Sequence, residues 1–152
     1  SAIIPLIVSD CLPQEPERMS ILAPTAFTTS MSVRDYECDM QGVVNNAVYQ
    51  HYLEHARHEF LKSRGLDFAA LTAQGIIVVV IRAELDYRRS LRSGDDFVIS
   101  VATERESRLR LAFVQQIVHV ATGAVVMDAR IVTTAVNGSG KPYFPAELQS
   151  LL

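Results

Sequence analysis

The chain is predicted to form an α+β domain in which an antiparallel sheet packs against one long helix. A length of 152 residues, with 49% hydrophobic and 20% charged residues, fits one globular domain with a real core. One stretch, residues 49–60, carries apolar side chains at helical spacing. Four runs with strand character follow, joined by short turns rather than by further long helices.

Two parts are expected along the chain. Residues 1–24 combine a short apolar run with a Pro- and charge-bearing stretch, which predicts a flexible N-terminal extension. No basic residue precedes the apolar run, so a secretory signal is not expected. Residues 25–152 form the predicted domain.

The first strand and the long helix open this domain. Phe27–Val33 is rich in Thr, Val and Met and is predicted to be a strand. Asn45 or Asn46 can cap the start of the helix, and Gly65 is placed to end it. Its apolar face comprises Tyr49, Tyr52, Leu53, Ala56 and Phe60.

The remaining elements alternate with polar or Gly-containing turns. Asp67–Gln74 is predicted to be a short helix. Ile76–Tyr87 opens with a continuous β-branched run, so its first half is predicted to be buried on both faces. Three further strands are expected at Asp96–Glu104, Leu109–Val120 and Ala124–Val136. A terminal helix is expected at Pro145–Leu152.

A carboxylate, Asp39, lies on the turn just before the long helix. A helix N-terminus offers backbone N–H groups that can stabilise negative charge developing on an oxygen, so a base or nucleophile beside it suits acyl transfer. Position alone is more typical of a turn Asp or a helix cap than of a catalytic residue.

The pattern D-x-x-G-V-V-x-N-x-x-Y resembles hotdog-fold acyl-CoA thioesterases of the 4-hydroxybenzoyl-CoA thioesterase type. It is formed here by Asp39, Gly42, Val43, Val44, Asn46 and Tyr49. The longer string VVNNAVY…RHEFL is similar to the plant and cyanobacterial branch, whose members act on acyl-ACP or acyl-CoA. The resemblance spans roughly Ser32 to Asn137. It implies the hotdog arrangement, in which the sheet wraps around the helix.

The resemblance also implies roles for three positions. Asp39 would attack the thioester carbonyl or activate a water, and the two routes stay open. The backbone N–H of Asn46 would polarise the carbonyl, and Gly42 would allow a tight turn beneath the substrate. A homodimer or homotetramer is implied, with each site at a subunit interface.

Substrate contacts are expected from the helix and from the apolar strand. Tyr49, Tyr52 and the run containing Ile77 and Val79 would line an apolar gap for the acyl chain. Glu54 lies on the helix flank and is either a secondary substrate contact or the partner of Arg57 or His58 in an ion pair.

Arginines concentrate in one stretch, which holds seven of the fourteen basic residues. They are Arg82, Arg88, Arg89, Arg92, Arg105, Arg108 and Arg110. One interpretation is an ordinary charged surface, and the other is a rim that meets the phosphates of CoA or of a carrier-protein arm, with Arg105, Arg108 and Arg110 in contact.

Several classes are disfavoured. The net charge of −3 argues against nucleic-acid binding, and no run reaches membrane-spanning length. His51, His55 and His58 share a helix face at spacings that suit zinc, yet no Cys or Asp completes a ligand set, and no cofactor is expected. Cys38 has no His placed to activate it.

Two rival functions remain. Hotdog hydratases and dehydratases use an Asp with a His five residues on, whereas Val44 occupies that position here. A non-catalytic acyl-binding or biosynthetic-accessory protein is the second alternative. Two cysteines without a disulfide framework predict a reducing compartment, the cytoplasm or, in a plant, the plastid stroma.

Overall fold

A computed structural model describes residues 26–152 of the chain. The extension predicted for residues 1–24 lies outside the described residues. The elements are β1 (Phe27–Ser32), the 3-10 helix η1 (Asp35–Glu37), α2 (Val48–Ser63), α3 (Phe68–Ala73), β2 (Ile77–Tyr87), β3 (Asp96–Arg105), β4 (Arg110–His119), β5 (Val125–Val136), β6 (Pro142–Tyr143) and α4 (Ala146–Gln149). All strands and helices predicted within residues 26–152 are present, and η1 and β6 are additions.

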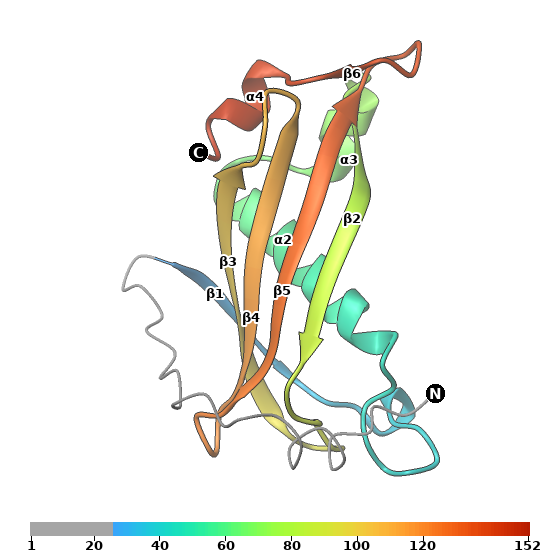
Figure 1. Ribbon diagram of the computed structural model, residues 1–152, viewed down its shortest axis with the longest axis vertical. Helices are drawn as coiled ribbons and strands as arrows, with labels where there is room; N and C mark the ends of the chain where they lie inside the picture. Colours follow the sequence, from blue (N-terminus) through green and yellow to red (C-terminus); the bar gives the residue numbers. More distant parts are fainter. Residues whose placement is uncertain (1–25) are drawn as a thin grey trace.

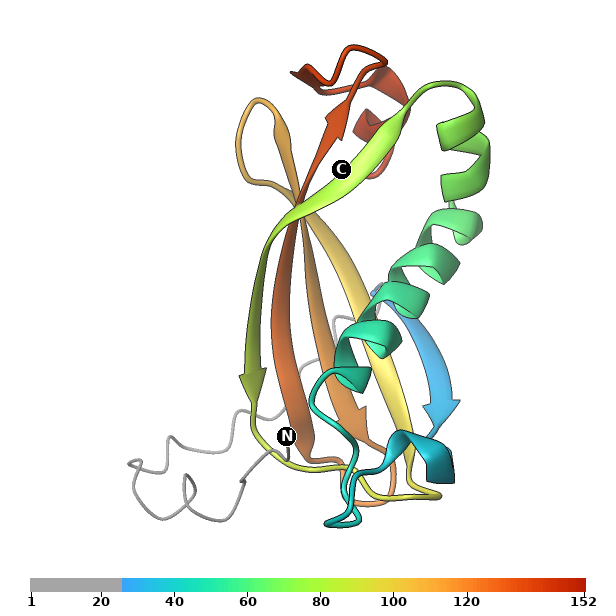
Figure 2. The same cartoon turned by 90° about the vertical axis from the view of Figure 1, so that its right-hand side faces the viewer.

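The strands form one antiparallel sheet in the order β1-β3-β4-β5-β2, with β6 pairing to one end of β5. Helix α2 lies against one face of this sheet, behind it in Figure 1, and the strands curve around the helix in the perpendicular view of Figure 2. The predicted α+β arrangement, a sheet wrapped around one long helix, is therefore confirmed.

The apolar stripe of α2 forms the centre of the core. All five predicted stripe residues are buried, from fully buried Tyr49 to Phe60 at 2% exposure. They face β3, β4 and β5, where Phe97, Phe113 and Met127 are buried as well. Burial of these aromatic and aliphatic side chains is the main stabilising contribution to the fold.

The helix ends as its sequence predicts. Gly65 adopts a φ of +75°, and the following Leu66 N–H donates to the Leu61 carbonyl at 2.9 Å, which ends α2 in the left-handed conformation. Asp67 then caps α3, since its Oδ1 accepts the N–H groups of Ala69 and Ala70.

The start of β2 differs from the prediction. Ile77, Val79, Val80 and Ile81 are 40%, 38%, 52% and 44% exposed. The cause is position, because β2 is an edge strand of the sheet and pairs only with β5 among the described residues. A register shift between Val80 and Arg82 leaves Ile81 without a partner in β5, as a bulge does.

Candidate active site

The loop that carries Asp39 is closed by backbone hydrogen bonds. Cys38 and Val44 pair as an isolated antiparallel bridge, and between them the Asp39 N–H donates to the Val43 carbonyl at 2.8 Å. Gly42 donates its N–H to the Asp39 carbonyl at 3.0 Å and has a φ of +78°. No atom lies within 4 Å of a Cβ built on Gly42, so the turn requires glycine for its backbone conformation rather than for space.

The two carboxylate oxygens of Asp39 have different surroundings. Oδ1 accepts the Gln41 N–H at 2.8 Å, which is the bond of a turn Asp. Oδ2 is buried and has no hydrogen-bond partner within residues 26–152. Leaving a buried carboxylate oxygen without a donor costs free energy, and such atoms are typical of functional sites. The loop therefore orients Asp39 through one oxygen and leaves the other without a donor.

Three hydrogen bonds hold the peptides between this loop and α2. The Asn45 N–H donates to the Glu37 carbonyl at 2.9 Å, and its side-chain oxygen accepts the Ala47 N–H at 3.0 Å. The Asn46 carbonyl accepts the Tyr87 hydroxyl at 3.0 Å. The predicted Asn cap is wrong, because α2 has Ala47 as its N-cap residue and no side-chain cap bond. Asn45 instead holds the turn just before the helix, and Tyr87 holds the Asn46 carbonyl from the end of β2.

Tyr49 and Tyr52 are core residues. The Leu91 N–H donates to the Tyr49 hydroxyl at 3.0 Å, and burial raises the pKa of Tyr49 to about 12. The Tyr52 hydroxyl is buried without a hydrogen bond among the described residues; burial and then the Glu37 carboxylate raise its pKa far above the ordinary value. At 0% and 1% exposure, neither ring presents an open surface to an acyl chain in this chain.

A groove of about 370 Å³ runs along α2 on the side of β2 and β5. Its floor is apolar, with Leu53, Val80, Ala83 and Ile131. Its helix side carries Ala47, Gln50, His51, Glu54 and Arg57. The groove lies between helix and sheet and begins one residue after Asn46, but none of the four residues predicted to line the acyl-chain gap lines it.

Of the predicted apolar contacts, the groove contains part of the strand run but neither Ile77 nor Val79. Ile77 begins β2, whereas Tyr87 ends it and contacts the Tyr49 ring at 5.6 Å. Ten residues of strand separate these ends by about 33 Å. Within one chain, therefore, the structure does not bring Ile77 and Tyr49 together.

Arg105, Arg108 and Arg110 also lie far from Asp39 in the same chain. They flank the β3–β4 turn at the top of Figure 1, whereas the loop holding Asp39 is at the bottom. Arg105 is engaged locally, donating to the Ser107 and Arg108 carbonyls and lying 4.3 Å from the Phe144 ring centre.

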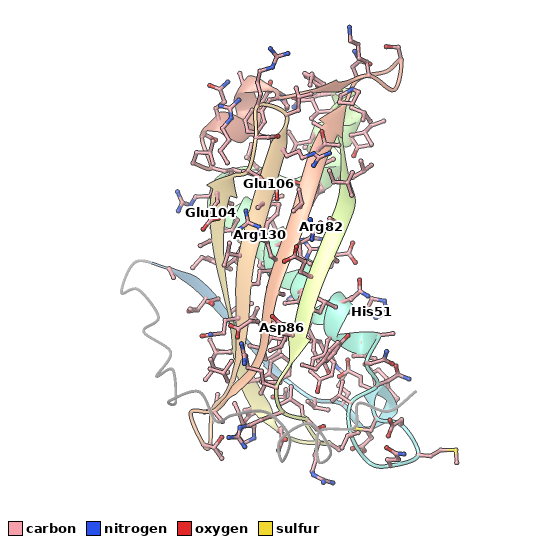
Figure 3. The ribbon with its side chains drawn as sticks, in the orientation of Figure 1. His51, Arg82, Asp86, Glu104, Glu106 and Arg130 are labelled. Carbon is pink, nitrogen blue, oxygen red and sulfur yellow. The ribbon has the colours of Figure 1, made fainter. Side chains whose placement is uncertain are left out.

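Ion pairs with nearby Glu residues engage other surface arginines. Arg82 pairs with Glu84 at 2.6 Å, and Arg130, outside the predicted cluster, pairs with Glu104 at 2.7 Å and Glu106 at 3.8 Å. Figure 3 shows these charged side chains spread over the strands on the face turned away from α2. This part of the cluster therefore matches the ordinary charged surface.

The predicted polar face of α2 is present. Glu54 lies 3.8 Å from His58, the expected pairing one turn apart, and also lines the groove. Burial lowers the pKa of His58, and the Glu54 carboxylate opposes that shift. No cluster of three His, Cys, Asp or Glu side chains within residues 26–152 is arranged to hold a metal ion. Of the helices described, none is long and apolar enough to cross a membrane.

Sequence reasoning missed the roles of three polar residues. Arg57 lines the groove, Gln115 accepts a hydrogen bond from Arg57, and Tyr87 donates one to the Asn46 carbonyl. Arg57 is one turn beyond Leu53 on the apolar stripe, and Gln115 interrupts an apolar alternation in β4. A polar residue at a core-facing position is itself a signal, because its burial requires a partner or a function.

The chain was compared with known proteins. The sequence model of the thioesterase-like superfamily matches residues 33–152. A chloroplastic acyl-acyl carrier protein thioesterase of Arabidopsis thaliana is 32% identical over 121 residues, covering 79% of this chain and 64% of the relative. This chain thus spans less than two-thirds of that relative's length.

Two further matches concern Escherichia coli and Aquifex aeolicus. A long-chain acyl-CoA thioesterase of Escherichia coli is 31% identical over 109 residues, covering 72% of this chain and 82% of the relative. The crystal structure of a hypothetical protein from Aquifex aeolicus superposes with a TM-score of 0.77 at 30% identity, covering 83% of this chain and 99% of that one.

Proposed function

The chain belongs to the thioesterase-like superfamily and has its hotdog fold, and on that basis we propose that it hydrolyses an acyl-CoA or acyl-ACP thioester. The relatives named as acyl-ACP and acyl-CoA thioesterases support this reaction class. The observation that carries the proposal is the asymmetric Asp39 carboxylate. One oxygen is held by the Gln41 N–H, and the other is buried with no donor among residues 26–152.

In the proposed reaction, Asp39 provides the negative oxygen that drives attack on the thioester carbon. It either bonds to that carbon, releasing the thiol and leaving an anhydride for water to open, or takes a proton from a water that attacks. The products are the carboxylic acid and the free thiol in both cases. The Asn46 backbone N–H would stabilise the developing oxyanion, a contribution of about 3 kcal/mol per donor.

Two side chains support this geometry without contacting the reacting atoms. Tyr87 holds the Asn46 carbonyl at 3.0 Å, which fixes the orientation of the peptides at the start of the helix. Tyr49 ties α2 to Leu91, whose carbonyl in turn accepts the Val44 N–H at 2.9 Å. A preorganised donor is worth more than a mobile one, because no reorganisation is needed during the reaction.

We also propose a homodimer formed through the β2 edge, alone or within a tetramer. Four adjacent apolar side chains on an edge strand are a surface that a second copy can cover. Antiparallel pairing of two β2 strands reverses the partner, so its β3–β4 turn would point toward the end of this chain that carries Asp39. The arginines of that turn would then be able to approach the phosphates of CoA or of a carrier-protein arm.

The proposal is tested with purified protein and matched panels of acyl-CoA and acyl-ACP thioesters. Wild type should release free thiol, and Asp39→Asn should lower kcat by about a hundredfold or more, the range of a general base or nucleophile. Asp86→Asn is the control, since Asp86 is exposed on β2, on the sheet face turned away from α2.

Other outcomes would separate the alternatives. Tight binding of acyl thioesters without hydrolysis by wild type would favour the non-catalytic acyl-binding or accessory protein. Equal turnover by wild type and Asp39→Asn would remove Asp39 from the mechanism. We also propose that the protein works in a reducing compartment, the cytoplasm or the plastid stroma. The chloroplastic relative is consistent with this location.

A further inference from the structure

Arg57 is a buried cation without a buried anion. It is 8% exposed on the core-facing side of α2, and no residue of the described chain forms an ion pair with it. Burial lowers the pKa of its guanidinium, which the Glu54 carboxylate partly opposes. Burying a charge in this way is costly unless another group compensates it.

The Arg57 side chain is held in one orientation. Its Nη1 donates to the Gln115 side-chain oxygen at 3.0 Å, and Gln115 in turn donates through Nε2 to the Leu53 carbonyl at 3.0 Å. Gln115 is 2% exposed, so this bridge is inside the protein. The other two guanidinium nitrogens make no hydrogen bond to residues 26–152 and are not among the buried atoms without partners.

Arg57 lines the groove described above, at the end farther from the helix start. Ala47 and Arg57 are ten residues apart on α2, which places them about 15 Å apart along the helix axis. The floor between them is apolar, with Val80, Ala83 and Ile131. The groove therefore combines an apolar middle with a fixed cationic donor at its far end.

We propose that Arg57 forms a subsite for an oxygen-bearing group on the distal part of the acyl chain, a hydroxyl, carbonyl or carboxylate. The inference rests on the proposed thioesterase function, because the thioester is taken to lie at the helix start. An oxygen acceptor would use guanidinium donors that the protein leaves unused. A plain alkyl end would desolvate the same donors without replacing the lost hydrogen bonds, so the groove discriminates against it.

The negative charge of Glu54 determines which oxygen-bearing group binds best beside Arg57. It lines the same groove one turn before Arg57, its side chain is 55% exposed, and its nearest charged contact is His58 at 3.8 Å. A ligand carboxylate would meet the repulsion of Glu54 as well as the attraction of Arg57, whereas a hydroxyl or carbonyl would meet only the attraction. Neutral oxygen groups are therefore expected to bind better than carboxylates.

The test uses acyl-CoA thioesters from octanoyl to tetradecanoyl, each with a plain, an ω-hydroxy and an ω-carboxy end. Wild type should hydrolyse the ω-hydroxy form of at least one chain length with a kcat/KM about tenfold above the plain form, through KM. Arg57→Met should abolish this preference, so that the ω-hydroxy and plain forms are hydrolysed with equal kcat/KM. Arg64→Met is the matched control, since Arg64 follows α2 and lies 5.3 Å from the Phe60 ring centre, outside the groove.

Gln115→Met provides a second variant, because it keeps the charge of Arg57 but removes the acceptor that orients it, together with the bond to the Leu53 carbonyl. It should weaken the preference without reversing it. A preference of wild type for plain chains at every length would overturn the subsite, as would an equal loss for both substrates in Arg57→Met. If wild type hydrolysed no thioester, the proposed function would fail. Calorimetric titration with ω-hydroxy and plain fatty acids would then test the subsite directly, and equal affinities would overturn it.

Discussion

Tyr49 shows how burial changes the chemistry of a single side chain beside the candidate site. Its hydroxyl is fully enclosed and accepts the Leu91 N–H, and its pKa rises from 10.0 to about 12. The folded chain therefore keeps the phenol proton in a pH range where the unfolded chain loses it. The contribution of Tyr49 to the free energy of unfolding is fully present below pH 10. It falls by about 3 kcal/mol in all as the pH rises toward 12.

Tyr49→Phe should flatten this alkaline loss. The variant also leaves the buried Leu91 N–H without its acceptor, so at neutral pH it should be less stable by about 1–3 kcal/mol. Urea unfolding from pH 8 to pH 12 measures both effects. The free energy of unfolding should still fall somewhat at alkaline pH in Tyr49→Phe, because burial raises the pKa of Tyr52 and Tyr87 as well. Tyr36→Phe, at an 80% exposed position, is the control and should leave the alkaline loss unchanged.

Single polar residues also mark the limit of what the sequence predicts. Asp39 could be selected because it lies in a family-like pattern before a helix, but the different surroundings of its two oxygens depend on the Gln41 N–H and on burial by the fold. Arg57 and Gln115 meet across 58 positions of sequence. From the sequence, Arg57 is a possible ion-pair partner of Glu54, and only the tertiary structure shows that it is buried and bonded to Gln115.

The Asp39 loop is the element on which the proposed chemistry depends. Gly42 holds a φ of +78° with open space around it, so an added Cβ would cause backbone strain and no clash. Gly42→Ala should lower the free energy of unfolding by about 1 kcal/mol. It should also reduce kcat several-fold, because the Gln41 N–H that orients Asp39 lies in the same turn.

Gly138→Ala is a matched control for this change. Gly138 also has open space around its Cβ position, but its φ is not in the left-handed region. Alanine there should leave both stability and turnover close to wild type. Chemical unfolding and steady-state hydrolysis of one acyl-CoA compare the two variants. Equal effects of both substitutions would show that the Gly42 conformation does not matter to the site.

Strand β2 shows where pattern reading is ambiguous. A continuous run of Ile and Val predicts burial on both faces when a strand lies inside a sheet. The same run also suits an edge strand whose exposed side chains contact another subunit, and the sequence does not distinguish the two. The structure places the run at the sheet edge, with Val80 52% exposed. An apolar run thus predicts that a strand is buried, but not whether the same chain or another subunit buries it.

The order of the strands in the whole sheet is a property that local patterns did not give. The helix, the strand positions and the antiparallel turns follow from periodicity and turn residues between Phe27 and Val136. The order β1-β3-β4-β5-β2 places β2, the first strand after the helices, beside β5, the last of the long strands. This pairing joins residues about fifty positions apart, so local sequence patterns do not predict it.

Exposed apolar surface at the β2 edge predicts the state of the molecule in solution. Ile81 is 44% exposed, sits at the bulge and does not line the groove. Ile81→Lys should therefore fold as a monomer, because a charge on an edge strand opposes pairing with a second copy. Analytical ultracentrifugation should show wild type as a dimer or tetramer and the variant at half that mass or less.

Activity should fall with the loss of the dimer, because the arginine-bearing turn proposed to meet the substrate phosphates comes from the other copy. The expected loss is mainly in KM, and it should shrink at high enzyme concentration, where mass action restores association. Val120→Lys is the control: Val120 is 56% exposed but lies in the β4–β5 turn, away from β2. A monomeric wild type, or a monomeric Ile81→Lys with unchanged KM, would show that one chain suffices.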